Sequence, residues 1–130
     1  MENTVKINIP DGYVIEWNKN YNGVEIKADG EHFVIDANKP SYYCNWNDAM
    51  RYYTGSSWKL PTVKQLKVLA KHIDKINEVI RENNGYEIFG WLWSCEEKDE
   101  FRVWSVYMDD GGIYGGSKGS PTYVRAVSIL

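Results

Sequence analysis

The chain has 130 residues, 43% of them apolar and 25% charged, which is enough for one globular domain with its own core but leaves no room for a second full domain. The formal charge of -3 and the isoelectric point near 5.4 argue against nucleic acid and anionic membrane surfaces as partners, because neither attracts a mildly acidic protein. No apolar stretch predicts a signal peptide or a membrane span, so we expect synthesis in a cytoplasm. A role outside the cell would need release of the protein or its association with a particle.

Short strands separated by turns are predicted for the first forty residues. Asn22-Gly23 and Asp29-Gly30 stand between β-prone runs, which is a strong signal for tight hairpins. The predicted strands are Lys6 to Ile9, Tyr13 to Trp17, Val24 to Lys27 and His32 to Ile35. We interpret residues 1–40 as a small N-terminal β meander that precedes the main body, residues 41–130, with the two parts forming one compact unit.

Two helices are predicted in the middle of the chain. Asn45 or Asn47 can cap a short first helix, whose apolar residues fall on one face. For the second helix, Thr62 and Gln65 stand at the spacing of a capping box, and apolar residues recur every three or four positions until the chain approaches Gly85. This second helix is therefore expected to be the longest helix, ending near Asn84-Gly85.

The chain returns to β character after residue 90, where pairs of glycines divide it into short strands and exposed turns. Helices followed by strands, without alternation between the two, indicate an α+β fold with an antiparallel sheet. The predicted strands are Gly90 to Ser94, Phe101 to Met108, Ile113 to Tyr114 and Tyr123 to Ile129.

The two cysteines, Cys44 and Cys95, are too few for a disulfide framework. Together with His32 and His72 they also lack the spacing of a zinc site. We expect two buried thiols, and a disulfide between them is the alternative.

A set of motifs in the second part of the chain resembles the DUF1566 family. The motifs, in chain order, are Trp46-x-x-Ala49, Trp58-Lys59-Leu60-Pro61-Thr62 with Leu66, Trp93-Ser94 followed by Glu96, Val103-Trp104, and the closing Tyr123-Val124-Arg125-Ala126-Val127. The resemblance covers residues 42 to 130. The usual arginine of the second motif is Lys59 and the usual acid before Leu66 is Gln65, so the ion pair between those two positions is not expected here.

The DUF1566 family is similar to C-type-lectin-like domains, a fold also found in formylglycine-generating enzymes and in the variable proteins of diversity-generating retroelements. The resemblance therefore implies a C-type-lectin-like domain with two helices and short antiparallel strands, and says much less about function. The opening Ile7-x-Ile9-Pro10-x-Gly12-Tyr13 also resembles a leader common in proteins of gut Bacteroidales, such as Bacteroides, and of their prophages.

Two stretches of acidic or amide residues invite comparison with calcium sites. Trp46-Asn47-Asp48 spells a triplet that supplies calcium ligands in sugar-binding C-type lectins, but calcium needs six to eight converging oxygens and this triplet opens a helix, so we interpret its polar residues as a cap. Asp109-Asp110 would form a better cation site if it met Glu96 and Glu97 in space. An ordinary acidic turn is the preferred interpretation, and no metal or other cofactor is assigned.

The C-terminal strands carry aromatic residues that alternate with polar ones, so some must face inward and others outward. We predict that Trp93 and Trp104 are core residues. Arg125 lies between apolar residues in the closing strand, which predicts a buried guanidinium paired with a carboxylate or main-chain carbonyl groups. The outward set forms a candidate ligand face together with the acidic loops, and its residues are Trp91, Glu96, Glu97, Tyr107, Asp109, Asp110 and Tyr114.

No nucleophile and base, and no open metal set, stand out as they would in an enzyme, so we expect the protein not to be a catalyst. The leading hypothesis is a binding module for a glycan or a protein surface, with the loops of residues 91–118 as its ligand face. The alternative is a structural or assembly subunit of a phage or fimbrial particle, in which the same aromatic face packs against a neighbouring chain. The sequence does not define an oligomeric state.

Overall fold

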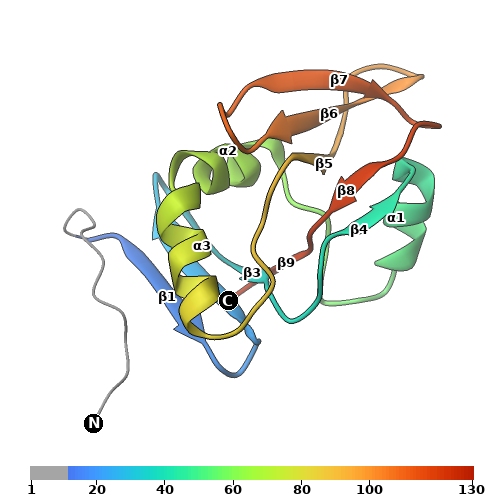
Figure 1. The fold of residues 1–130 in the computed structure, drawn as a ribbon. Helices are drawn as coiled ribbons and strands as arrows, with labels where there is room; N and C mark the ends of the chain where they lie inside the picture. Colours follow the sequence, from blue (N-terminus) through green and yellow to red (C-terminus); the bar gives the residue numbers. More distant parts are fainter. Residues whose placement is uncertain (1–11) are drawn as a thin grey trace, which may run out of the picture.

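The computed structural model describes residues 12–130, and in this range it contains three helices and nine strands (Figure 1). The helices are α1 (Trp46–Tyr52), α2 (Val63–Lys71) and α3 (Ile73–Glu82). The strands are β1 (Val14–Asn18), β2 (Gly23–Ala28), β3 (Glu31–Asp36), β4 (Tyr42–Cys44), β5 (Trp91–Glu97), β6 (Arg102–Tyr107), β7 (Ile113–Ser117), β8 (Thr122–Val124) and β9 (Val127–Ile129). The predicted α+β class is confirmed, and no helix of residues 12–130 is long and apolar enough to cross a membrane.

The first sheet has the strand order β1-β2-β3-β9, and its first three strands are the predicted meander. Asp29 and Gly30 both have positive φ, 52° and 84°, which is what a two-residue turn between β2 and β3 requires. The predicted strand from Lys6 to Ile9 lies outside the described residues. At the other side of β3, the end of the chain adds β9 in antiparallel register, with Phe33 opposite Ile129.

The second sheet has the strand order β4-β8-β5-β6-β7. All of its neighbouring strands are antiparallel except β5 and β8, which run parallel. The short segment from β8 to β9 links the two sheets, because β8 belongs to the second sheet and β9 to the first.

The first predicted helix is α1, and Asn45 is its cap: its side chain accepts a hydrogen bond from the Asp48 amide at 2.8 Å. The second predicted helix begins at the expected capping box of Thr62 and Gln65. However, it is divided into α2 and α3 at His72, which has φ −113° and ψ 19°. The division follows from packing, since α2 packs on β5 and β6 of the second sheet, whereas α3 packs on β1 and β2 of the first.

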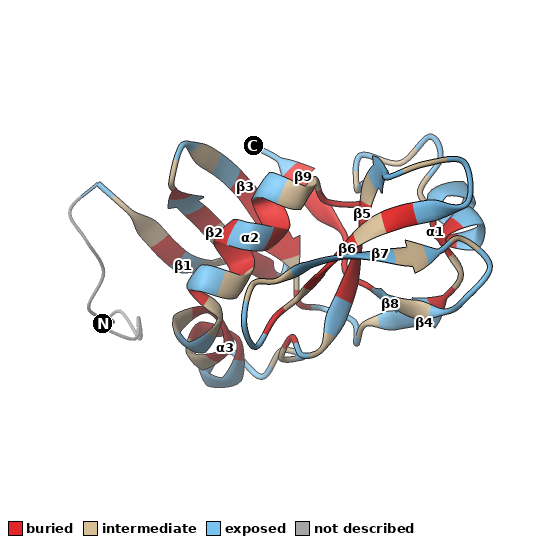
Figure 2. Ribbon diagram, turned by 90° about the horizontal axis from the view of Figure 1, so that it is seen from above, coloured by how far each residue is buried: buried red, intermediate tan, exposed pale blue. Residues whose placement is uncertain are grey.

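Two groups of buried side chains hold the elements together. The segments that contribute buried residues are red in Figure 2. The larger one lies between the first sheet, α2, α3 and the inner residues of β5 and β6. The smaller one lies between α1 and the second sheet. Two buried indoles in it form hydrogen bonds to the main chain: Trp46 Nε1 donates to the Ser94 carbonyl at 2.9 Å, and Trp93 Nε1 donates to the Cys44 carbonyl at 3.0 Å. Cys44 is buried and Cys95 half-buried, and both are free thiols.

Candidate functional site

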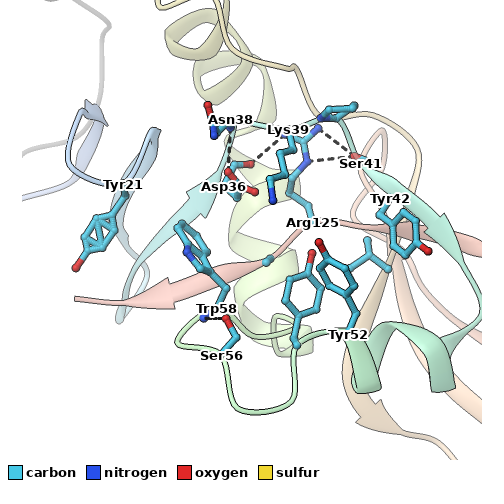
Figure 3. A pocket seen from close by; sticks show the side chains of 14 residues that line it. Tyr21, Asp36, Asn38, Lys39, Ser41, Tyr42, Tyr52, Ser56, Trp58 and Arg125 are labelled. Atoms are coloured by element: carbon cyan, nitrogen blue, oxygen red, sulfur yellow. Dashed lines mark hydrogen bonds between the residues drawn. The ribbon is translucent and has the colours of Figure 1, made fainter.

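An open cleft of about 730 Å³ lies between the loop from β3 to β4, the end of α1 and the closing segment of the chain (Figure 3). Its floor includes Val124, the last residue of β8, and Arg125 and Ala126, which connect β8 to β9. The cleft therefore lies where the two sheets meet, a position from which both sheets can fix its shape.

Aromatic rings form two opposed walls of this cleft. Tyr21 and Trp58 meet edge to face on one side, with ring centroids 6.1 Å apart. Tyr42 and Tyr52 lie on the other side at 5.7 Å, and both are exposed at the rim (Figure 3). Each wall takes its rings from two different segments of the chain, which is why no single sequence motif reveals it.

Arg125 lies in the floor of the cleft, is only 2% exposed, and connects the segments around it through hydrogen bonds. Its guanidinium donates to the carbonyls of Asp36 (3.0 Å), Tyr86 (2.7 Å) and Glu87 (2.9 Å), and to Ser41 Oγ from both Nε (3.2 Å) and Nη2 (3.0 Å). All five N–H groups have a partner, and every partner is neutral. Burial lowers the pKa of Arg125 to about 10, which the nearby Asp36 carboxylate opposes. The sequence predicted a buried guanidinium paired with a carboxylate or with main-chain carbonyls, and of these two the structure shows carbonyls.

Polar groups line the remaining edge of the cleft. Asp36 Oδ1 accepts the Asn38 amide at 2.9 Å, and Lys39 is exposed and makes no ion pair within residues 12–130. Burial raises the pKa of Tyr53 to about 12, so its hydroxyl remains a neutral donor and acceptor throughout the ordinary pH range. The cleft thus offers apolar rings on its sides and hydrogen-bonding groups along one edge.

Besides its tyrosines and Arg125, the cleft is lined by the polar side chains of Asp36, Lys39, Ser41 and Ser56. Within residues 12–130, no group of three or more His, Cys, Asp or Glu side chains is arranged to hold a metal ion.

The outward-facing aromatic residues predicted from the sequence form a separate cluster at the other end of the second sheet. Trp91 stacks on Tyr107 with centroids 4.5 Å apart, and meets Tyr114 edge to face at 4.5 Å. The two phenol groups donate to the neighbouring turn, Tyr107 to Asp109 at 3.0 Å and Tyr114 to Asp110 at 3.5 Å. These five residues form what we term the β7 patch.

The other two predicted ligand residues, Glu96 and Glu97, lie at the opposite end of the β5–β6 hairpin from the β7 patch. Glu96 Oε2 accepts the Val63 amide at 2.6 Å, at the start of α2, and Glu97 Oε2 pairs with Lys118 Nζ at 2.7 Å. The seven predicted residues therefore divide into two groups, since an antiparallel hairpin holds its two ends apart by its own length.

The two tryptophans that were expected to be core residues differ in how deeply they are buried. Trp93 is 2% exposed and belongs to the smaller buried group, as predicted. Trp104 is only half-buried, with Lys98 Nζ 5.1 Å from its ring centroid. The prediction for Trp104 is wrong because it points to the opposite side of β6 from Val103 and Ser105, beyond the part of the sheet that α2 covers.

Sequence reasoning missed the aromatic cleft as a site. Its available signal was the pair of tyrosine doublets, Tyr42-Tyr43 and Tyr52-Tyr53, on either side of a helix whose core residues are Trp46 and Ala49. One tyrosine of each doublet, Tyr42 and Tyr52, is exposed at the rim of the cleft.

One comparison with known proteins gives a match. The model of the family described as the Lcl C-terminal domain matches residues 13–128, which includes the β meander as well as the segment that carries the DUF1566 motifs. A comparison with curated proteins finds no match.

Proposed function

This chain belongs to the family of Lcl C-terminal domains, and we propose that it is a non-catalytic binding module that holds a glycan in the aromatic cleft. We further infer a C-type-lectin-like arrangement, on the basis of the DUF1566 motifs and the two-sheet α+β fold. If the protein acts outside a cell, it reaches that place by release or as part of a particle.

The observation that carries this proposal is the pair of opposed aromatic walls beside a polar edge. The apolar CH faces of a sugar ring stack on flat Tyr and Trp rings, while its hydroxyls need donors and acceptors at the side. Trp58 and Tyr21 supply one stacking wall, Tyr42 and Tyr52 the other, and Asp36 lies at the polar edge. A cleft of about 730 Å³ has room for more than one sugar unit.

The cleft is also held in shape before any ligand arrives. Arg125 ties the end of β3, the loop at Ser41 and the loop at Tyr86 and Glu87 to the closing segment through five hydrogen bonds. A site that is already ordered loses less entropy on binding, which favours affinity for weakly binding ligands such as sugars.

We place the glycan in the cleft rather than on the β7 patch for a geometric reason. The rings of Trp91, Tyr107 and Tyr114 stack on one another, and their hydroxyls are held by Asp109 and Asp110. Those rings form a self-packed surface, which fits a flat protein contact better than the faces of a sugar ring.

The test compares two tryptophans. Isothermal titration with neutral oligosaccharides released from glucan, xylan and mannan should find at least one that binds, and Trp58→Ala should lower its affinity by at least about tenfold, equivalent to about 1.4 kcal/mol. The matched control is Trp91→Ala, which removes an indole from the β7 patch and should leave the affinity unchanged.

Two results would count against the proposal. One is equal binding by the wild type and Trp58→Ala. The other is loss of binding in Trp91→Ala alone, which would return the ligand to the C-terminal loops. Melting curves of both variants establish that each is folded before its affinity is interpreted.

A further inference from the structure

The strand β7 lies at an open edge of the second sheet. In the order β4-β8-β5-β6-β7 it has one neighbour, β6, and within residues 12–130 no other strand pairs with it. Figure 1 shows β7 at the outer margin of the molecule, with no element beyond it. One side of its backbone therefore faces solvent.

The register identifies which backbone groups point outward. Tyr107 N–H donates to the Gly112 carbonyl at 3.0 Å, and Lys118 N–H donates to the Phe101 carbonyl at 2.9 Å. Because hydrogen-bonded pairs alternate along an antiparallel ladder, the even-numbered residues of β7 bond to β6. The odd-numbered ones, Ile113, Gly115 and Ser117, direct their amide and carbonyl groups to the open edge, where the Ser117 carbonyl accepts the Ser120 amide at 3.1 Å.

The strand β7 itself carries none of the features that usually prevent association. One lysine lies beside it, since Lys98 Cδ would be 2.8 Å from a Cβ added at Gly115. Natural edge strands are protected by lysine, proline, a bulge or very short length. The sequence of β7 is Ile-Tyr-Gly-Gly-Ser, its five residues are uncharged, and its pairing with β6 is regular throughout. By contrast, the other outer strand of this sheet, β4, has only three residues.

We propose that β7 pairs antiparallel with β7 of a second copy of this chain, about a two-fold axis at Gly115. This register sets Tyr114 opposite Gly116 of the second copy and joins two five-stranded sheets into one. It also keeps the acidic turns at Asp109 and Asp110 at opposite ends of the seam, whereas a parallel arrangement would set them side by side. The acidic turns therefore favour the antiparallel form over the parallel one, whereas Lys98, which lies beside Gly115, is close to the seam in both.

Each face of the sheet carries an apolar side chain at this seam. Tyr114 of the β7 patch is 43% exposed on one face, and Ile113 is 39% exposed on the other, because successive residues of a strand point to opposite faces. The Trp93 ring lies against Gly116, 2.9 Å from where a Cβ would be, so the second copy's Tyr114 would meet the edge of that ring across the seam. Each such contact occurs twice in a two-fold dimer, which doubles its contribution.

Sedimentation equilibrium of the full chain between about 1 µM and 1 mM tests the association, a span that covers weak and moderate dimers. The variant Ser117→Pro removes an outward N–H and leaves the ladder to β6 intact, so it should raise the dimer dissociation constant by at least about tenfold. Ile129→Ser is the control: it removes a 68% exposed apolar residue from β9, which belongs to the other sheet, and should leave the constant unchanged.

Amide hydrogen exchange of the unmodified protein gives a second readout that does not depend on any variant folding. The amides of Gly115 and Ser117 should become protected as the concentration rises, while the Tyr114 amide, already bonded to β6, should not change. A chain that stays monomeric at 1 mM overturns the proposal. A dimer in which the Gly115 and Ser117 amides still exchange freely overturns it as well, because that dimer uses another surface.

Discussion

Replacing Arg125 with methionine should strongly destabilise the protein, because its guanidinium is the donor for three otherwise separate carbonyl groups. A buried acceptor left without a donor costs about 1–3 kcal/mol, so three would cost about 3–9 kcal/mol. Water entering through the adjacent cleft can satisfy part of this need, which favours the lower end of the range. We expect Arg125→Met to lose about 3–5 kcal/mol of unfolding free energy, comparable to breaking a buried ion pair.

That loss is a large part of the total unfolding free energy of a domain of 130 residues, which is about 6–20 kcal/mol at roughly 0.05–0.15 kcal/mol per residue. Urea unfolding followed by tryptophan fluorescence measures it, and thermal unfolding should show a melting temperature lower by roughly 10–20 °C. Arg125→Lys keeps the charge and three donors but not the planar fork, so it should recover only part of the loss. A cost below about 1 kcal/mol for Arg125→Met would refute the view that this side chain ties the three segments together.

Three further predictions follow from single contacts. Burial raises the pKa of Tyr53 to about 12, so its neutral hydroxyl should stabilise the fold fully below pH 10 and lose that contribution as the pH rises through 12. Absorbance titration at 295 nm and alkaline unfolding, each compared between the wild type and Tyr53→Phe, check this. The hydrogen bond from Tyr13 holds the pKa of Asp29 below its usual value. The Asp29 carboxylate should therefore stabilise the fold above about pH 3.9 and lose that contribution as the pH falls through its lowered pKa. In Asp29→Asn, the free energy of unfolding should fall less steeply with decreasing pH. Asn45→Ala removes the cap of α1 and should cost about 1 kcal/mol in urea unfolding, whereas a neutral result would mean that Asn45 does not cap the helix in solution.

Much of the fold could be predicted because its signals are local. The turn at Asp29-Gly30, the cap at Asn45 and the capping box at Thr62 each involve residues close together in the chain, and all three occur in the structure. The division of the long helix at His72 could not be predicted in this way, because the helical pattern of apolar residues continues through it. The break accompanies a change of packing partners, since α2 contacts mainly β5 and β6 and α3 contacts mainly β1 and β2.

The candidate site was harder to predict because it depends on contacts between distant segments. Tyr21 and Trp58 meet across more than thirty residues of chain, and Arg125 reaches carbonyl groups at Asp36 and Tyr86. Alternation in a strand indicates which residues share a side, but not which part of that side another element covers. That limit explains why Trp93 was predicted correctly as a core residue and Trp104 was not.

The most direct test of the proposed binding site is fluorine NMR of protein labelled with 5-fluorotryptophan. The chain has six tryptophans, so the spectrum should contain six signals, each assigned by one Trp→Phe variant. During titration with the binding oligosaccharide, the account predicts a progressive shift of the Trp58 signal while the Trp91 and Trp93 signals stay in place. A shift of the Trp91 signal with Trp58 unchanged, or no shift of Trp58 with any oligosaccharide of the set, would contradict it.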